Sequence, residues 1–339
     1  MLTEKENLLM VYRGEIPEWI PVGRMGAADG PPPSSMMVGP PLLSPQQEAG
    51  GGRDIWGVNY IPTESTGNAL IPDNTEFILP IDNLKNWREV IKAPDLTGVD
   101  WEKLVKERIE KANIDREQTA LALSMHFGYL QLLMSFMGFE DGLLAFYEEP
   151  DHVHELLEYL SEFYMSVADE VLDLFAPEIL SIADDTAAWG APFLSDDMYR
   201  EFIAPHHDKY VKRGLDRGCF MSMHNCGKCE TLTDLWVEMG FSSWNPAQTC
   251  NDLQAVKARH GNKLTISGGW DGRGRLMEPD VTDEEIRQSV RDTIDALAPG
   301  GGFTWGGGFL GALDDPEPVR KTAVVIDEAT KYGRDFYKR

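Results

Sequence analysis

The feature that most constrains the fold is a regular alternation of short apolar segments with amphipathic ones. Six apolar segments, each bounded by a turn or a helix start, lie at 119–125, 179–183, 219–223, 241–244, 264–268 and 302–305. The stretches between them repeat apolar residues at helical spacing and are long enough to cross over a sheet. Strands that are apolar on both faces and are joined by helices are typical of parallel sheets. The sequence therefore predicts an α/β fold.

The number of βα units predicts a closed form of this fold. Residues 20–25 (IPVGRM) add a seventh predicted strand, and an eighth is not evident in the sequence. Seven or eight such units in 339 residues are typical of a single distorted (β/α)8 TIM barrel, here spanning 1–339. A doubly wound sheet is the alternative, although no GxGxxG or P-loop follows a predicted strand. Thr282 and Glu285 form a capping-box pattern that predicts the start of a helix.

The segment 26–53 interrupts the regular pattern, because it is dense in glycine and proline. Such a composition excludes a long helix or a central strand. Two Met and two Leu within it favour packing against the rest of the chain. We therefore expect a loop or lid laid over a site.

Charge and cysteine content narrow the function classes. The formal net charge is −25 and no Lys/Arg cluster is present, so we expect no nucleic-acid partner. No apolar run reaches the length of a membrane span, and the first residues carry no secretion signal. Four cysteines at irregular spacing do not form a disulfide framework, so a reducing cytoplasm is the expected location.

Polar and aromatic residues follow most of the predicted strands. In a parallel barrel the carboxyl ends of the strands meet at one mouth, where chemistry takes place. Each residue alone has a plainer explanation as a helix cap, a turn former or a core residue. Their shared position predicts a common pocket that contains His126, Asp184, Asp185, His224, Cys226, Asn245, Gln248, Trp270 and Asp271.

The stretch MHNCGKCE (223–230) carries the most specific signal. His224 and Cys226 are two positions apart, so in an extended strand they face the same side. Imidazole and thiolate are ligands that zinc prefers, and a catalytic zinc takes three ligands from the protein. The alternative is a redox dithiol of Cys226 and Cys229. We favour Cys229 as a small buried residue in the first turn of a helix.

Several segments together resemble the uroporphyrinogen decarboxylase superfamily over nearly the whole chain. They are IPVGRM, LMSFMGFEDGLLAFYEEPDHVHELL, ADDTAAWGAPFLSDDMYREFIAPHH, MHNCGK, SWNPAQTCNDLQAVKARHGNKLTISGGWD and ALAPGGGF. The resemblance implies a distorted (β/α)8 barrel with its pocket at the carboxyl-terminal mouth.

The resemblance leaves two branches to separate. Decarboxylases carry a segment resembling MRQAGRY, whose arginines neutralise substrate carboxylates; here RMGAADGPPP keeps Arg24 but lacks the second arginine. Zinc-dependent methylcobalamin:thiol methyltransferases carry His-x-Cys-Gly, which is matched at 224–227, and a third ligand Cys in a late glycine-rich segment. Here that segment, GGGFTWGGGFLG, has no Cys and places Phe309 near the position. The candidates for a third ligand are Cys250, Asp184 and Asp185.

The remaining pattern resembles the first methyltransferase of corrinoid-dependent O-demethylase systems. It implies transfer of a methyl group from a small methylated donor, most simply a methoxylated aromatic, to cobalt(I) of a separate corrinoid protein. A separate carrier also agrees with the sequence, which contains no Asp-x-His-x-x-Gly cobalamin motif. The expected cofactors are zinc and cobalamin carried by the partner, and a homodimer is one option for the assembly. The alternatives are a carboxy-lyase, the thiol methyltransferase, or a non-catalytic corrinoid- or metal-binding protein.

Residue roles follow from this interpretation. We expect His224 and Cys226 to bind zinc, and Asp184 and Asp185 to act as catalytic acids. The residues expected to contact the substrate are His126, Gln248, Trp270 and Asp271.

Overall fold

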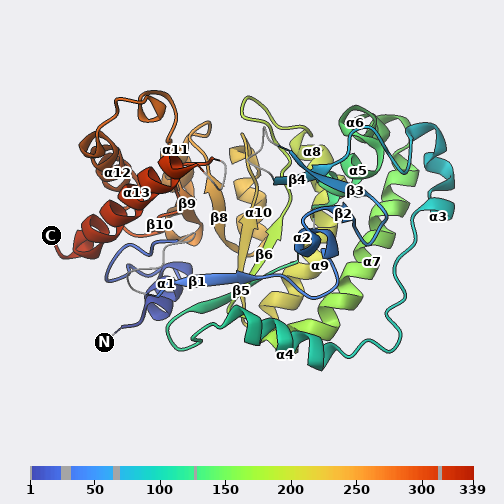
Figure 1. Cartoon of the computed structure of the whole chain (residues 1–339), viewed down its shortest axis with the longest axis horizontal. Helices are drawn as coiled ribbons and strands as arrows, with labels where there is room; N and C mark the ends of the chain where they lie inside the picture. Colours follow the sequence, from blue (N-terminus) through green and yellow to red (C-terminus); the bar gives the residue numbers. More distant parts are fainter. Residues whose placement is uncertain (1, 24–31, 64–68, 126–127, 312–314) are drawn as a thin grey trace.

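The centre of the molecule is a curled parallel sheet of seven strands (Figure 1). A computed structural model describes residues 2–23, 32–63, 69–125, 128–311 and 315–339. The strand order is β1-β5-β6-β7-β8-β9-β10, and every neighbouring pair is parallel. The predicted parallel α/β fold is therefore confirmed. The strands are β1 (Ser35–Val38), β5 (Ala120–Ser124), β6 (Ile179–Ala183), β7 (Phe220–His224), β8 (Phe241–Ala247), β9 (Thr265–Gly268) and β10 (Phe303–Thr304).

The two edges of this sheet differ from the prediction of a closed barrel. The ladder ends at β1 and β10, and within the described ranges no ladder joins these two strands. The described part of the predicted strand 20–25 forms an isolated parallel bridge between Val22 and Trp305. Pro21 accepts a hydrogen bond from Trp305 N at 2.8 Å but has no N–H to extend the ladder. The edge strand β1 lies inside the segment 26–53, where we expected a loop or lid.

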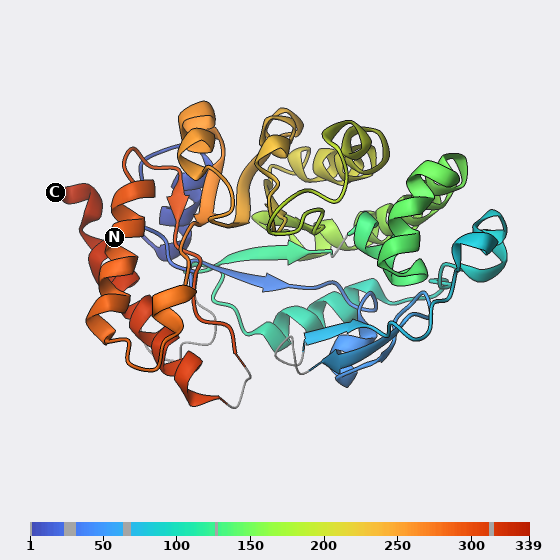
Figure 2. The ribbon, with the colours of Figure 1, turned by 90° about the horizontal axis from the view of Figure 1, so that it is seen from above.

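Helices pack mainly along the outer side of the sheet, and both termini lie near its β10 end (Figures 1 and 2). No helix among the described residues is long and apolar enough to cross a membrane. The helices are α1 (Glu4–Tyr12), α2 (Pro45–Ala49), α3 (Trp87–Val90), α4 (Trp101–Ala112), α5 (Tyr129–Met137), α6 (Phe139–Glu148), α7 (Pro150–Phe175), α8 (Asp196–Met198), α9 (Ala204–Leu215), α10 (Thr233–Met239), α11 (Leu253–His260), α12 (Asp283–Leu297) and α13 (Pro316–Arg334).

Local sequence explains most helix boundaries. The capping box of α12 is confirmed: Glu285 N donates to Thr282 Oγ1 at 3.2 Å and Thr282 N donates to Glu285 Oε2 at 2.8 Å. Pro150 is the first residue of α7 and Glu149 is its N-cap. Gly138, with φ of +90°, separates α5 from α6. A side chain would not fit at this position, because a Cβ there would lie 2.8 Å from the Phe77 ring.

The chain forms a small antiparallel sheet in the stretch of sequence between β1 and α4. It consists of β2 (Gly52–Arg53), β3 (Asn59–Thr63) and β4 (Ala69–Pro72), in the order β2-β3-β4. In Figure 1 it lies at the end of the molecule that also holds α2 and α5, away from β9 and β10. It therefore adds a wall at the β5 side of the main sheet.

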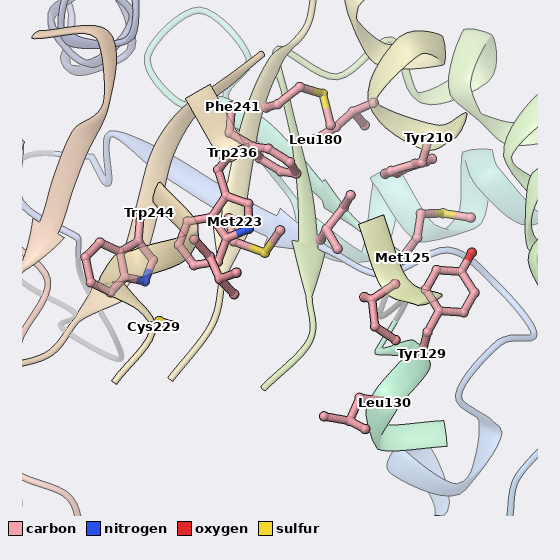
Figure 3. Close-up of a cluster of buried hydrophobic side chains, with 14 of the residues drawn as sticks. Met125, Tyr129, Leu130, Leu180, Tyr210, Met223, Cys229, Trp236, Phe241 and Trp244 are labelled. Atoms are coloured by element: carbon pink, nitrogen blue, oxygen red, sulfur yellow. The ribbon is translucent and has the colours of Figure 1, made fainter. Parts of the chain in front are cut away.

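The core fills the space between the strands and the outer helices (Figure 3). Met223, Trp236 and Trp244 are fully buried there, and the two indole rings lie 5.8 Å apart. Tyr129 and Leu130, in the first turn of α5, are buried in the same layer. This packing fixes the strand ends from outside and leaves the carboxyl-terminal mouth for polar side chains.

Candidate metal centre and its two cavities

Three potential ligands converge where β6 and β7 end. Ala183 of β6 pairs with His224 of β7, so Asp185 and Cys226, each two residues further on, follow neighbouring strand ends. His224 Nε2 lies 3.8 Å from Cys226 Sγ and 3.9 Å from Asp185 Oδ1. All three ligand atoms lie within 4.8 Å of one another, and no other His/Cys/Asp/Glu group of this kind occurs among the residues that the structure describes. We call Asp185, His224 and Cys226 the triad.

The donor set and spacing of the triad fit a zinc ion. Zinc–ligand distances near 2.0–2.3 Å in a tetrahedron place neighbouring ligand atoms about 3.3–3.8 Å apart. The separations of 3.8 and 3.9 Å are close to this range. Three protein ligands leave one tetrahedral position open, as in catalytic zinc sites. Of the predicted third-ligand candidates, the structure brings Asp185 into the group and leaves Asp184 and Cys250 outside it.

The amide of Asn245 fixes the tautomer of His224. Asn245 Nδ2 donates to Ser222 Oγ at 2.9 Å and faces the Met223 carbonyl at 3.4 Å. The amide oxygen therefore points to His224 Nδ1, 2.9 Å away, and accepts its proton. The lone pair of the ring then lies on Nε2, the nitrogen that faces Asp185 and Cys226. This is the orientation that a metal-binding histidine requires.

The turn after His224 is held in place by two hydrogen bonds and by a close approach to Ala187. Cys226 N donates to Asp185 Oδ1 at 2.8 Å, and Gly227 N donates to Gln248 Oε1 at 2.7 Å. Gly227 has φ of +84°, and a Cβ there would lie 2.3 Å from the Ala187 carbonyl oxygen. Only glycine fits this turn. Gln248, which we expected to contact substrate, thus also positions the ligand turn.

The thiols of the CGKC segment lack the properties of a redox dithiol. Burial and the neighbouring Asp185 carboxylate raise the pKa of Cys226 to about 12. Burial likewise raises the pKa of Cys229, whose side chain is fully buried. Reactive dithiols have lowered thiol pKa values, so the metal-site interpretation is favoured.

The two predicted catalytic carboxylates lie in different environments. Asp184 is fully buried and accepts hydrogen bonds from the first backbone N–H groups of α5, with Tyr129 N at 3.0 Å. His207 Nε2 lies 3.4 Å from the same carboxylate oxygen, and burial raises the pKa of Asp184. Asp185 is half-buried and belongs to the triad. The structure therefore places Asp184 behind the site, where it joins the end of β6 to α5 and α9.

A large cavity opens beside His224 and Cys226, over the ends of β8, β9 and β10. Its volume is about 650 Å³, and part of its wall is backbone of Gly268, Gly269, Gly272, Gly306, Gly307 and Gly308. Trp270 and Phe309 form an edge-to-face pair in this wall, with ring centroids 5.1 Å apart. Asp271 lines the cavity and pairs with Arg273 through contacts of 2.6 and 2.8 Å, which help lower the pKa of Asp271 to about 2.

The structure thus brings three of the four predicted substrate-contact residues to one cavity. Gln248, Trp270 and Asp271 line the large cavity together with two triad residues. His126 lies outside the described residues.

A second cavity of about 520 Å³ lies between α5 and the small antiparallel sheet. We call it the sheet-covered cavity. Gln131 of α5 lines it, and Gln131 Nε2 lies 3.3 Å from Asp185 Oδ2. Sequence reasoning missed Gln131, although its position in the first turn of a helix that follows a strand end is a usable signal.

Comparisons with known proteins give a family and a shared fold. The model of the uroporphyrinogen decarboxylase (URO-D) family matches residues 86–309, more than half of the chain. A solved methyltransferase from Methanosarcina mazei superposes with a TM-score of 0.64 at 14% identity, with 100% of both chains covered. A structure described as native KDPGal reaches a TM-score of only 0.31 at 12% identity, over 70% of this chain and 80% of that one, and carries no argument.

Among curated proteins none matches the sequence. The likeness to the Methanosarcina protein concerns the fold, since the two sequences share so few residues. The length of the family match is what decides the classification. On that ground, the chain belongs to the uroporphyrinogen decarboxylase (URO-D) family.

Proposed function

We propose that the protein is a methyltransferase that moves a methyl group from a methoxylated aromatic donor to cobalt(I) of a separate corrinoid protein. The observation that carries the proposal is the triad of Asp185, His224 and Cys226 beside a large, mostly apolar cavity. The fold shared with a methyltransferase supports it. We further propose that the curled sheet is a distorted (β/α)8 barrel that is completed beside Val22 and β1.

The reaction breaks the bond between the methyl carbon and the ether oxygen and forms a cobalt–carbon bond. Cobalt(I) supplies both electrons of the new bond and becomes cobalt(III), while the oxygen keeps the electrons of the broken bond and takes up a proton. An aryl oxide leaves poorly without help at its oxygen. A zinc ion held by Asp185, His224 and Cys226 would supply that help as a Lewis acid.

The chain's own residues orient this site. Asn245 keeps Nε2 of His224 free of a proton, and Gln248 fixes the turn that carries Cys226. Gln248, Trp270 and Asp271 form the wall where the methyl group and the cobalt face meet. Asp185 would hold the zinc from the end of β6, and the adjacent Asp184 joins that strand end to α5 from behind.

The carboxy-lyase alternative is disfavoured by charge. A porphyrinogen with many carboxylates needs several free cations in its pocket. Arg273 is the one Lys or Arg among the described residues that line the large cavity, and it is paired with Asp271. The thiol methyltransferase alternative shares the metal chemistry and differs in the acceptor.

Methyl transfer can be tested directly with free cobalamin. The protein, loaded with zinc, is incubated with cobalt(I) cobalamin and a panel of methoxylated aromatics, and methylcobalt(III) is followed by absorbance. We expect methylcobalt together with the free phenol from at least one donor. No methylcobalt from any donor would reject the proposal, and release of CO2 from a porphyrinogen would favour the carboxy-lyase.

The metal assignment has a separate test. Zinc content is measured by elemental analysis in the wild type, in Cys226→Ser and in Cys250→Ser. We expect the zinc content to fall in Cys226→Ser and to stay unchanged in Cys250→Ser, because Cys250 lies outside the triad. Equal zinc content in all three proteins would remove Cys226 from the ligand set.

A further inference from the structure

We propose that the two cavities divide the reaction, so that the sheet-covered cavity holds the aromatic ring of the donor and the large cavity admits the cobalt face. This inference rests on the proposed function and names the donor as a methoxylated aromatic that also bears a free hydroxyl group. Nothing in the family match or in the fold likeness assigns a ligand to the sheet-covered cavity.

Two residues of the triad line the large cavity, and the third, Asp185, contacts Gln131 of the sheet-covered cavity. Asp185 follows β6 and His224 ends β7, the third and fourth strands in the order of the main sheet. The large cavity is lined by residues at the ends of β8, β9 and β10, on one side of these strands. The sheet-covered cavity is lined by α5, by the small sheet and by Met125 after β5, on the other side. Gln131 connects this cavity to the triad through Asp185.

Methyl transfer by direct displacement is compatible with such an arrangement. Displacement at a methyl carbon places the attacking cobalt and the departing oxygen on opposite sides of that carbon. A donor held in the same cavity as the corrin face would compete with it for space. A ring held on the β5 side, with its methoxy group directed past Gln131 toward the triad, leaves the far side of the methyl group open to the large cavity.

The walls of the sheet-covered cavity suit an aromatic ring. Trp56, Phe77 and Phe139 line it, together with Leu132 of α5. A cavity of about 150 Å³ already holds benzene. The observed volume of about 520 Å³ therefore accommodates a substituted ring.

One polar atom in this cavity has no partner among the described residues. Gln46 is only 7% exposed, lines the cavity, and its Oε1 is without a hydrogen bond from the part of the chain that the structure describes. A buried acceptor without a donor costs free energy. Oε1 itself has almost no accessible surface, so a ligand hydroxyl would recover this cost once the Gln46 amide turns toward the cavity. In the large cavity, by contrast, Gln248 Oε1 and the Asp271 carboxylate already accept hydrogen bonds from the protein.

The hydroxyl is tested by calorimetric titration of the zinc-loaded protein without a corrinoid, with 2-methoxyphenol and methoxybenzene as probes. We expect the wild type to bind 2-methoxyphenol about five- to tenfold more tightly, as one neutral hydrogen bond allows. Gln46→Leu should abolish this difference. Gln254→Leu, at an exposed glutamine on α11, should keep it. A difference that survives in Gln46→Leu would overturn the assignment of Gln46.

The cavity itself is tested by a pair of filling substitutions. Leu70→Trp on β4 fills the sheet-covered cavity, and Thr249→Trp fills the large one. We expect Leu70→Trp to weaken 2-methoxyphenol binding at least tenfold and Thr249→Trp to leave it unchanged while it slows methyl transfer to cobalamin. The reverse pattern would overturn the division of the cavities.

These outcomes are separate from failure of the proposed function. Binding that follows the expected pattern without formation of methylcobalt would reject the methyltransferase and keep the ring site. Methylcobalt formation with the reverse binding pattern would keep the methyltransferase and reject the ring site. No binding of either probe to the wild type would overturn the ring site outright.

Discussion

The orientation of the His224 ring is set by Asn245, which is 21 positions away in the sequence. The sequence predicts that His224 and Cys226 share a face, because that follows from strand geometry alone. It does not predict which ring nitrogen carries the proton, since this depends on an amide from the neighbouring strand. The same limit applies to Asp184 and Asp185: adjacent in sequence, they lie in different environments, one buried behind α5 and one at the triad.

The role of Asn245 gives a first prediction. Asn245→Leu removes the acceptor at His224 Nδ1, so the ring loses the contact that fixes its tautomer. We expect zinc affinity to fall about 10- to 100-fold, as for other partners of metal-bound histidines. Competition with a chelating dye measures the change. Asn86→Leu is the control and should bind zinc normally, since Asn86 is exposed and its side chain donates a hydrogen bond to Asn83. Unchanged affinity in Asn245→Leu would contradict the assigned orientation.

A second prediction concerns Asp54, which lines the sheet-covered cavity. Burial raises its pKa from 3.8 to about 6, although backbone N–H groups of Trp56 and Val58 donate to it at 2.9 Å. A carboxyl with a raised folded-state pKa favours folding below pH 3.8, and this contribution is lost as the pH rises through about 6. The native protein is therefore penalised for the charged Asp54 at neutral pH.

Asp54→Asn should remove this penalty. The difference in unfolding free energy, variant minus wild type, should rise by about 2 kcal/mol between pH 4.5 and 7.5. Chemical denaturation at both pH values measures it. Asp95→Asn is the control: Thr97 lowers the pKa of this exposed carboxylate from 3.8, so its pH dependence lies below the tested window and the difference should stay nearly constant between pH 4.5 and 7.5. A flat difference for Asp54→Asn would mean that its carboxyl is not desolvated.

At the scale of elements, periodicity predicted the strands that form the centre of the sheet, from β5 to β10. It missed β1. Ser35–Val38 lies among prolines and glycines, so no local preference marks it as a strand, and it is held by pairing with β5. It also missed the break between α5 and α6. That break depends on contact of Gly138 with Phe77, which comes from a distant segment.

The turn that joins β7 to α10 gives a third prediction. In Gly227→Ala the new methyl group would meet the Ala187 carbonyl oxygen at 2.3 Å and the residue would keep φ of +84°. We expect the zinc content to fall. We also expect the loss of stability to exceed clearly the cost of placing an alanine in left-handed backbone, which is about 1–2 kcal/mol. Gly218→Ala, at φ of +72° with nothing within 4 Å of the new carbon, isolates that backbone cost and should keep its zinc. Equal losses in the two variants would show that the close approach is relieved by a small shift.

At the scale of the whole molecule, the mouth of the sheet was predictable and the sheet-covered cavity was not. Strand order brings Asp185, His224, Gln248 and Trp270 to one edge in any parallel α/β arrangement of these segments. The wall of the second cavity comes from β3 and β4, which pair with each other in a stretch that reads as irregular extended chain. The cavity that it forms with α5 joins segments far apart in the sequence, and no local pattern predicts that contact.

The placement of the two cavities on opposite sides of the triad yields a last prediction, on stereochemistry. If cobalt attacks the methyl carbon directly, a donor whose methyl group carries hydrogen, deuterium and tritium should give methylcobalamin of inverted configuration. A route in which Cys226 first accepts the methyl group would involve two displacements and give retention. Direct attack is favoured because burial and Asp185 keep the thiol of Cys226 protonated when no metal is bound, while zinc would occupy its sulfur as a ligand. Cys250→Ser, with the triad intact, should also give inversion. Retention in the wild type would show that the methyl group rests on the protein, and the division of the two cavities between ring and cobalt would then lose its geometric basis.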